Sequence, residues 1–143
     1  MLTTFALVKS YGNLNDEIKE PMLVPFMNQA SYEVQTLFSD YADVETELSG
    51  SAPTQRSIDI QLGETYLALA YSIIPLNTRA SVEGGFIQSI GFSDSETRLL
   101  TQTEANKLYS HYKSMAYGKL SAYIDASVEE PDKVNGPMGW FIV

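Results

Sequence analysis

Apolar residues recur every three or four positions along most of this 143-residue chain, and that period is typical of one face of an α-helix. One such pattern begins at Pro53 or Thr54, and Leu67 and Ala68 add apolar surface on a second side, so we expect this helix to be the most deeply buried. Its apolar stripe consists of Ile58, Leu62, Tyr66, Leu69, Ala70, Ile73 and Ile74. The period therefore favours a mainly α fold.

Three further helices follow from the same pattern. A short helix is expected over residues 4–11, ending at Gly12-Asn13, two residues that tolerate left-handed backbone. A first turn at 16–20 and a main helix over 21–38 come next, and a helix over 101–124 follows the capping-box spacing of Thr101 and Glu104. The inward residues of the helix over 21–38 are predicted as Met22, Phe26, Ala30, Val34, Leu37 and Phe38. Those of the last helix are Ala105, Leu108, Tyr109, Tyr112, Met115, Ala116, Leu120 and Tyr123.

The segments between these helices have different compositions. Residues 39–53 are polar and acidic and are predicted to form a mobile loop. Gly63 costs its helix on the order of 1 kcal/mol relative to alanine, which indicates a close helix crossing there. Pro75 is expected to end or kink the helix, because proline lacks the backbone donor. The alternating pattern within residues 82–100 then predicts a short hairpin.

The predicted fold is thus a mainly α, four-helix bundle-like domain over residues 1–125. It carries a short extended or β-hairpin insertion at 80–100. An acidic linker and an extended, apolar C-terminal tail occupy residues 126–143, ending in Trp140-Phe141-Ile142-Val143. That tail either folds back on its own domain or inserts into a partner, where burial of four large side chains contributes several kcal/mol, of order 25 cal/mol per Å².

Charge and composition exclude several classes of protein. The chain has no cysteine, which excludes disulfides and thiolate metal sites, and its net charge of −9 disfavours binding to nucleic-acid backbones or anionic membranes. No targeting signal or membrane-spanning run is recognisable, so we expect a soluble protein folded in the cytoplasm.

No motif for catalysis or metal binding stands out. His111 is the single histidine, and the acids that begin at Asp40 fail the calcium-loop spacing, so no metal or cofactor is expected. Carboxylates such as Asp59 and Glu64 have no supporting motif. Lys107, Lys113 and Lys119, six residues apart, spread around their helix and form no nucleic-acid stripe. We do not expect an enzyme.

The order of these parts resembles that of the head–tail connector, or adaptor, proteins of tailed double-stranded DNA bacteriophages. The likeness covers roughly residues 3–125. It rests on Val8-Lys9-Ser10-Tyr11, a helix through Ala30-Ser31, Leu69-Ala70-Tyr71, the break at Leu76-Asn77-Thr78-Arg79, Gly84-Gly85-Phe86 to Gly91, and Leu120-Ser121-Ala122-Tyr123-Ile124.

The resemblance implies a virion neck protein that is assembled in the host cytoplasm. Copies of the chain would form a ring, usually of twelve, beneath the portal protein. Stopper or tail proteins would follow, and DNA would pass through without specific binding. The extended insertion, with Gly84, Gly85, Phe86, Ile90 and Phe92, would contact a neighbouring copy. The tail residues Trp140, Phe141, Ile142 and Val143 would dock on the portal.

Two other classes of function stay open at this point. One is another phage neck, head-completion or tail-completion protein; a stopper would be mainly β, which the helical pattern disfavours. The other is a cytoplasmic helical binding module that uses the acidic first half as its contact surface. Deleting residues 134–143 distinguishes a connector, which should fail to attach, from an acidic module, which should be nearly indifferent.

Overall fold

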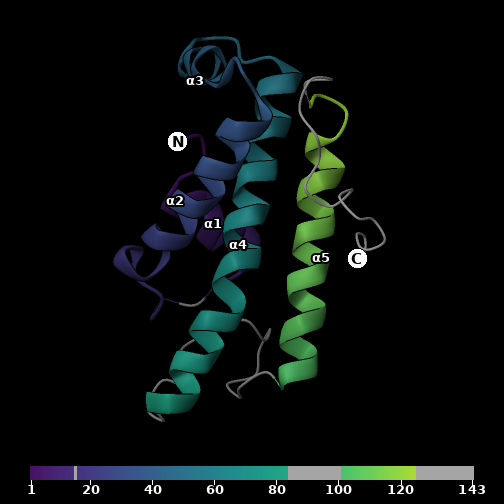
Figure 1. Ribbon diagram of the computed structural model, residues 1–143. Coiled ribbons are helices and arrows are strands. Elements are labelled where there is room, and N and C mark those ends of the chain that lie inside the picture. Colours follow the sequence, from purple (N-terminus) through teal and green to yellow (C-terminus); the bar gives the residue numbers. More distant parts are fainter. Residues whose placement is uncertain (15, 84–100, 125–143) are drawn as a thin grey trace.

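The computed structural model describes residues 1–14, 16–83 and 101–124. Within these ranges the protein consists of helices and contains no strand, so the mainly α prediction is confirmed. The helices are α1 (Phe5–Gly12), α2 (Glu20–Leu37), α3 (Tyr41–Ser49), α4 (Gln55–Glu83) and α5 (Gln102–Leu120) (Figure 1). The predicted hairpin at 84–100 and the tail at 126–143 lie outside the described residues.

Helix α4 is the centre of the fold, as its apolar sequence predicts. It packs against each of the other four helices, with α2 on one side and the antiparallel α5 on the other (Figure 1). Every residue from Gly63 to Ala70 is buried, which is possible only for a helix covered on all sides. The fully buried side chains on and around it include Leu23, Val34, Ile60, Leu67, Leu69, Ile73 and Leu120.

The close crossing predicted at Gly63 is confirmed, and the residue opposite it is Leu120 of α5. A Cβ atom at Gly63 would lie 2.4 Å from Leu120 Cδ2 and 2.5 Å from its Cγ. Ordinary carbon contacts are about 3.5–4.0 Å. The absence of a side chain at Gly63 therefore allows α4 and α5 to approach this closely.

Two of the predicted helix ends are confirmed: the end of α1 at Gly12-Asn13 and the start of α5 at Thr101. Thr4 caps α1 by accepting a hydrogen bond from the Leu7 amide at 3.2 Å, and Asn13 ends it with left-handed backbone at φ 52°. At the start of α5, Thr101 Oγ1 accepts from the Glu104 amide at 3.1 Å, while the Glu104 carboxylate accepts from the Thr101 amide at 2.9 Å. This reciprocal pair is a capping box, which satisfies two amides that the helix leaves free.

The loop predicted over residues 39–53 is wrong, because most of it forms α3. Tyr41 and Val44 are buried, and Leu48 packs against the core. These three apolar residues, spaced by three and four, lie among acids that dominate the composition of the segment. Arg56 on α4 further fixes the start of α3 by an ion pair with Asp40 at 3.0 Å. The described part therefore has five helices where four were predicted.

Pro75 does not end α4, which continues to Glu83 and changes direction toward its C-terminal part (Figure 1). Residues 80–83, assigned from the sequence to the insertion, therefore belong to this helix. An interior proline costs a helix about 3 kcal/mol or more. Ile73 and Leu76 are 0% and 3% exposed on either side of it, and their burial offsets this cost.

Some of the residues predicted to face the core on α2, α4 and α5 differ from those that are buried in the structure. The buried face of α2 centres on Leu23 and Met27, while Met22 and Phe26 are only partly buried. Ile58 was predicted to face inward but is 36% exposed. In α5 the buried residues are Ala105, Ala116, Tyr117 and Leu120, so Tyr117 was missed. The other residues predicted inward on α5 are partly buried.

Candidate functional site

Residues 1–4, which we call the N-terminal strap, lie against α4 and are held there by side chains of that helix. The Leu2 and Thr3 amides donate to Glu64 Oε2 at 2.9 and 3.0 Å. Gln61 Nε2 donates to the Leu2 carbonyl at 2.9 Å, and the hydroxyls of Thr3 and Thr65 are 2.8 Å apart. Leu2 and Thr3 are both buried, so the strap is part of the core.

Glu64 is the chemically most unusual residue of the described part, because its side chain is fully buried. Besides the two strap amides, it accepts a hydrogen bond from the Tyr41 hydroxyl to Oε1 at 2.7 Å. Burial raises the pKa of the Glu64 carboxyl above its ordinary value, while the Thr3 amide, the Tyr41 hydroxyl and the Leu2 amide oppose that shift. Three donors thus hold a carboxylate that has no access to solvent.

A directed chain of hydrogen bonds leads to Glu64 from the surface of α2. Gln35 Nε2 donates to Ser31 Oγ at 3.0 Å, and Ser31 Oγ lies 3.1 Å from the Tyr41 hydroxyl. Because the Tyr41 hydroxyl proton is directed to Glu64, the Ser31 hydroxyl is the donor in that second bond. Burial is also the main reason that the pKa of Tyr41 is raised. The chain connects α2, α3, α4 and the strap, and it stabilises their arrangement.

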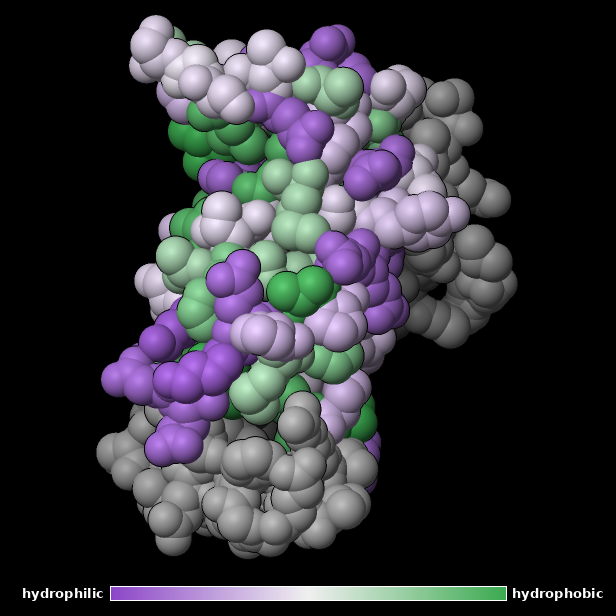
Figure 2. Space-filling model, turned by 90° about the vertical axis from the view of Figure 1, so that its left-hand side faces the viewer, coloured by the Kyte–Doolittle hydropathy of each residue, from purple (hydrophilic) through white to green (hydrophobic). Residues whose placement is uncertain are grey.

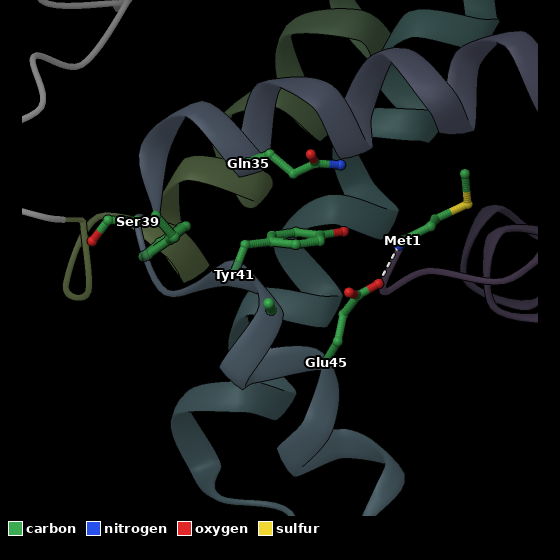
Figure 3. A pocket seen from close by; sticks show the side chains of 7 residues that line it. Met1, Gln35, Ser39, Tyr41 and Glu45 are labelled. Atoms are coloured by element: carbon green, nitrogen blue, oxygen red, sulfur yellow. Dashed lines mark hydrogen bonds and ion pairs between the residues drawn. The ribbon is translucent and has the colours of Figure 1, made fainter.

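A shallow pocket of about 380 Å³ lies beside this network, between the end of α2, α3 and Met1 (Figure 3). Its lining consists of Met1, Gln35, Phe38, Ser39, Tyr41, Ala42 and Glu45. The Met1 ammonium group and the Glu45 carboxylate form an ion pair at its edge. These two charges compensate each other, so the pocket offers hydrogen-bonding groups without a net charge.

A second polar cluster joins α2, α4 and α5. The carboxylate of Glu33 accepts hydrogen bonds from the hydroxyls of Tyr71 and Tyr117, one on each of its oxygens. The ammonium group of Lys113 lies 5.8 Å from the ring centre of Tyr71 and 5.6 Å from that of Tyr109. Such cation–π contacts contribute roughly 0.5–1 kcal/mol at exposed sites. The cluster therefore fastens the two outer helices to α4.

The described residues contain no group of three or more potential metal ligands. The same part of the chain contains no helix that is long and apolar enough to span a membrane. His111 is exposed on α5.

The residues that the sequence singled out for binding lie outside the described ranges: Gly84, Gly85, Phe86, Ile90 and Phe92 in the insertion, and Trp140, Phe141, Ile142 and Val143 in the tail. The points at which these segments leave the helical domain are described. The insertion follows Glu83 at the end of α4, and the tail follows Ile124, a few residues beyond α5.

Sequence reasoning did not identify the Glu64 network. Glu64 was named only as a carboxylate without a motif. Its helical neighbours on the buried side, Ile60 and Leu67, lie four residues before and three residues after it, so its position on the apolar face was a usable signal of burial. Its donors come from residues 2, 3 and 41, which are distant in sequence.

The fold and this site define a small helical protein whose polar network ties helices together. Comparisons of the chain with protein-family models, with curated proteins and with solved structures return no match.

Proposed function

We propose that this protein is a structural subunit of a phage virion, a head–tail connector that joins a DNA-filled head to its tail. In this proposal copies form a ring beneath the portal, and the ring provides a passive conduit for DNA. The resemblance in the order of helices, insertion and tail suggests the family, and the mainly α fold is compatible with it.

The observation that carries the proposal is the placement of the two exits. Because α4 and α5 are antiparallel, the insertion leaves the pair at one end and the tail leaves it at the other (Figure 1). The 19 residues of α5 separate these ends by about 28 Å, at 1.5 Å per residue. A connector needs contacts to a neighbour or the next ring at one level and to the portal at another, and this separation supplies two levels.

Several contacts hold α5 against the other helices near the exit of the tail. Leu120 packs directly over Gly63, and the Tyr123 hydroxyl donates to Asp59 Oδ2 at 2.8 Å near the exit of the tail. Three residues before Leu120, the Tyr117 hydroxyl donates to the Glu33 carboxylate of α2. Interhelical contacts of this kind suit a part that transmits mechanical load between two assemblies.

The charge is also consistent with a passive conduit. A ring of twelve chains with a net charge of −9 each has a formal charge of about −108, which repels DNA at long range. A filter-binding assay at low salt tests this point, and tight, salt-sensitive DNA binding would contradict it.

The decisive experiment disrupts the gene in its source genome and images the resulting particles by negative-stain microscopy. The proposal expects free tails beside leaking or emptied heads, and intact tailed virions would overturn it. Complementation with a chain that lacks residues 134–143 should reproduce the defect, whereas a matched variant with Asp43→Asn and Glu47→Asn on α3 should restore tailed particles. The opposite result would favour an acidic binding module that uses the first half of the chain.

A further inference from the structure

The outer face of α2 has a composition that solvent exposure does not explain. The face, which we call the neutral α2 face, consists of exposed, uncharged residues opposite the core: Pro21, Val24, Pro25, Asn28, Gln29, Tyr32, Gln35 and Thr36. Between Pro21 and Thr36 the only charge is Glu33, which is half-buried and bonded to Tyr71 and Tyr117. The solvent face of a surface helix normally carries charged residues.

Tyr32 lies at the centre of this face and is 70% exposed, the largest exposed fraction among the big apolar side chains of the described residues. Protein interfaces are depleted in charge at their centre and enriched in tyrosine. Figure 2, which views the molecule from the side of α2, shows a mosaic of pale, green and purple surface without one large apolar patch. That mosaic is typical of subunits that are stable alone and associate reversibly.

The outer face of α5, on the other side of α4, has complementary properties. Lys107, His111, Ser114 and Gly118 are exposed and follow one another at spacings of four, three and four, so they share one stripe. A Cβ atom at Gly118 would meet nothing within 4 Å. A glycine inside a helix costs about 1 kcal/mol, and no contact among the described residues requires one at this position. Its small size permits close approach of another helix.

The two sides also differ in charge. Residues 16–49, which include α2 and α3, have eight acidic residues against Lys19, a formal net charge of −7. Helix α5 has Glu104 against Lys107, Lys113 and Lys119, a formal net charge of +2. Lys107 and Lys119 are exposed, whereas Lys113 lies against the Tyr71 and Tyr109 rings. Contact between two α2–α3 sides would place like charges together. Contact between the α2 side of one copy and the α5 side of another brings opposite charges together, which favours encounter.

We infer that copies of this chain associate head to tail, with the neutral α2 face of one copy packed on the outer face of α5 of the next. The two helices have 18 and 19 residues, so their lengths match. They lie on different sides of α4, which lets each copy engage two neighbours (Figure 1). Such heterologous contacts form rings when the rotation between copies closes. The inference deepens the proposed function and rests on it for the closed ring.

The test uses the absence of cysteine from the chain. Two single variants, Tyr32→Cys and Ser114→Cys, are mixed at high protein concentration and treated with a short bismaleimide cross-linker. Both positions are exposed, so both variants should fold. We expect the mixed dimer to form about tenfold faster than the dimer from a matched control pair, Thr46→Cys on α3 with Ser114→Cys, equivalent to about 1.4 kcal/mol of preference. The double variant Tyr32→Cys/Ser114→Cys should give a ladder of multimers.

Equal rates for the two pairs would overturn the inference. So would a Tyr32→Cys chain that cross-links to itself as fast as to Ser114→Cys, because that result indicates a symmetric contact. Adding Lys107→Glu and Lys119→Glu should slow cross-linking, as should salt near 1 M, where the Debye length falls to about 3 Å. The cross-linking experiment needs no phage. The contact between α2 of one copy and α5 of the next can therefore be refuted while the gene disruption still gives free tails, and the reverse can also occur.

Discussion

Replacement of Gly63 by alanine tests whether the close crossing of α4 and α5 sets the stability of the domain. The new Cβ would lie 2.4 Å from Leu120 Cδ2 and 2.5 Å from its Cγ. Because Leu120 is fully buried, it has to move by about 1 Å within a packed core to restore an ordinary contact. Overpacking of this kind costs about 1–3 kcal/mol, and a shift of this size belongs near the upper limit.

Alanine also gains helix propensity over glycine, by about 1 kcal/mol. The net loss expected for Gly63→Ala is therefore about 2 kcal/mol, which lowers the Tm of a chain of this size by about 4–8 °C. Gly118→Ala is the matched control in α5, since a Cβ there meets nothing within 4 Å. It should gain about 1 kcal/mol in dilute solution, where no neighbour covers α5. Urea unfolding followed by circular dichroism measures both values.

A double-mutant cycle then assigns the loss to the contact itself. Leu120→Ala alone should cost about 2–5 kcal/mol, and it should cost less in the Gly63→Ala background because the clash has gone. A Gly63→Ala protein at least as stable as the unmodified protein would refute the reasoning. Additive effects of the two substitutions would show that the lost stability does not come from the contact between these residues.

Further predictions concern the polar networks and the cap of α5. Burial raises the pKa of Glu64 above 4.5, so the contribution of this carboxyl to stability is fully present below about pH 4.5 and is lost as the pH rises through the raised pKa. The difference in unfolding free energy between the unmodified protein and Glu64→Gln should therefore fall from pH 4 to pH 8. A difference that stays constant over this range would contradict the burial of the charge. Tyr117→Phe removes a hydrogen bond to the Glu33 carboxylate and should cost about 1.5–3 kcal/mol in urea unfolding, whereas Tyr32→Phe, on an exposed side chain, should stay within about 0.5 kcal/mol. Thr101→Ala removes the cap of α5 and should lower the unfolding free energy by about 1 kcal/mol. Thr101→Ser keeps a capping hydroxyl and should retain most of that stability, and calorimetry distinguishes the two variants.

The sequence predicted those elements whose signals are local. The stripe along α4, the end of α1 at Gly12-Asn13, the capping box of α5 and the special role of Gly63 all depend on residues a few positions apart. Helix α3 was missed because its acids outweigh its buried residues, Tyr41 and Val44, in any average over the segment. Whether Pro75 ends α4 is decided by tertiary burial around it, which a proline rule does not include.

The polar site was less predictable than the fold. The Glu64 carboxylate accepts hydrogen bonds from the amides of Leu2 and Thr3, which precede it by 62 and 61 residues, and from the hydroxyl of Tyr41, which precedes it by 23. No short window of sequence contains Glu64 together with these donors. The choice between a surface acid and a buried one depended on how α4 is rotated. An error of one position in the predicted faces, as occurred in α2, is sufficient to move a side chain between solvent and core.

The position of the strap also has a consequence for folding during synthesis. Leu2 and Thr3 are synthesised before their partner Glu64, which is added 61 residues after Thr3 and therefore roughly 3–12 s later at 5–20 residues per second. Leu120, which packs over Gly63, follows later still. The strap residues therefore wait for α4 to be synthesised before they can form these native contacts. We expect a nascent chain released before α4 is complete to leave the strap open to proteases, and one that includes α5 to protect it.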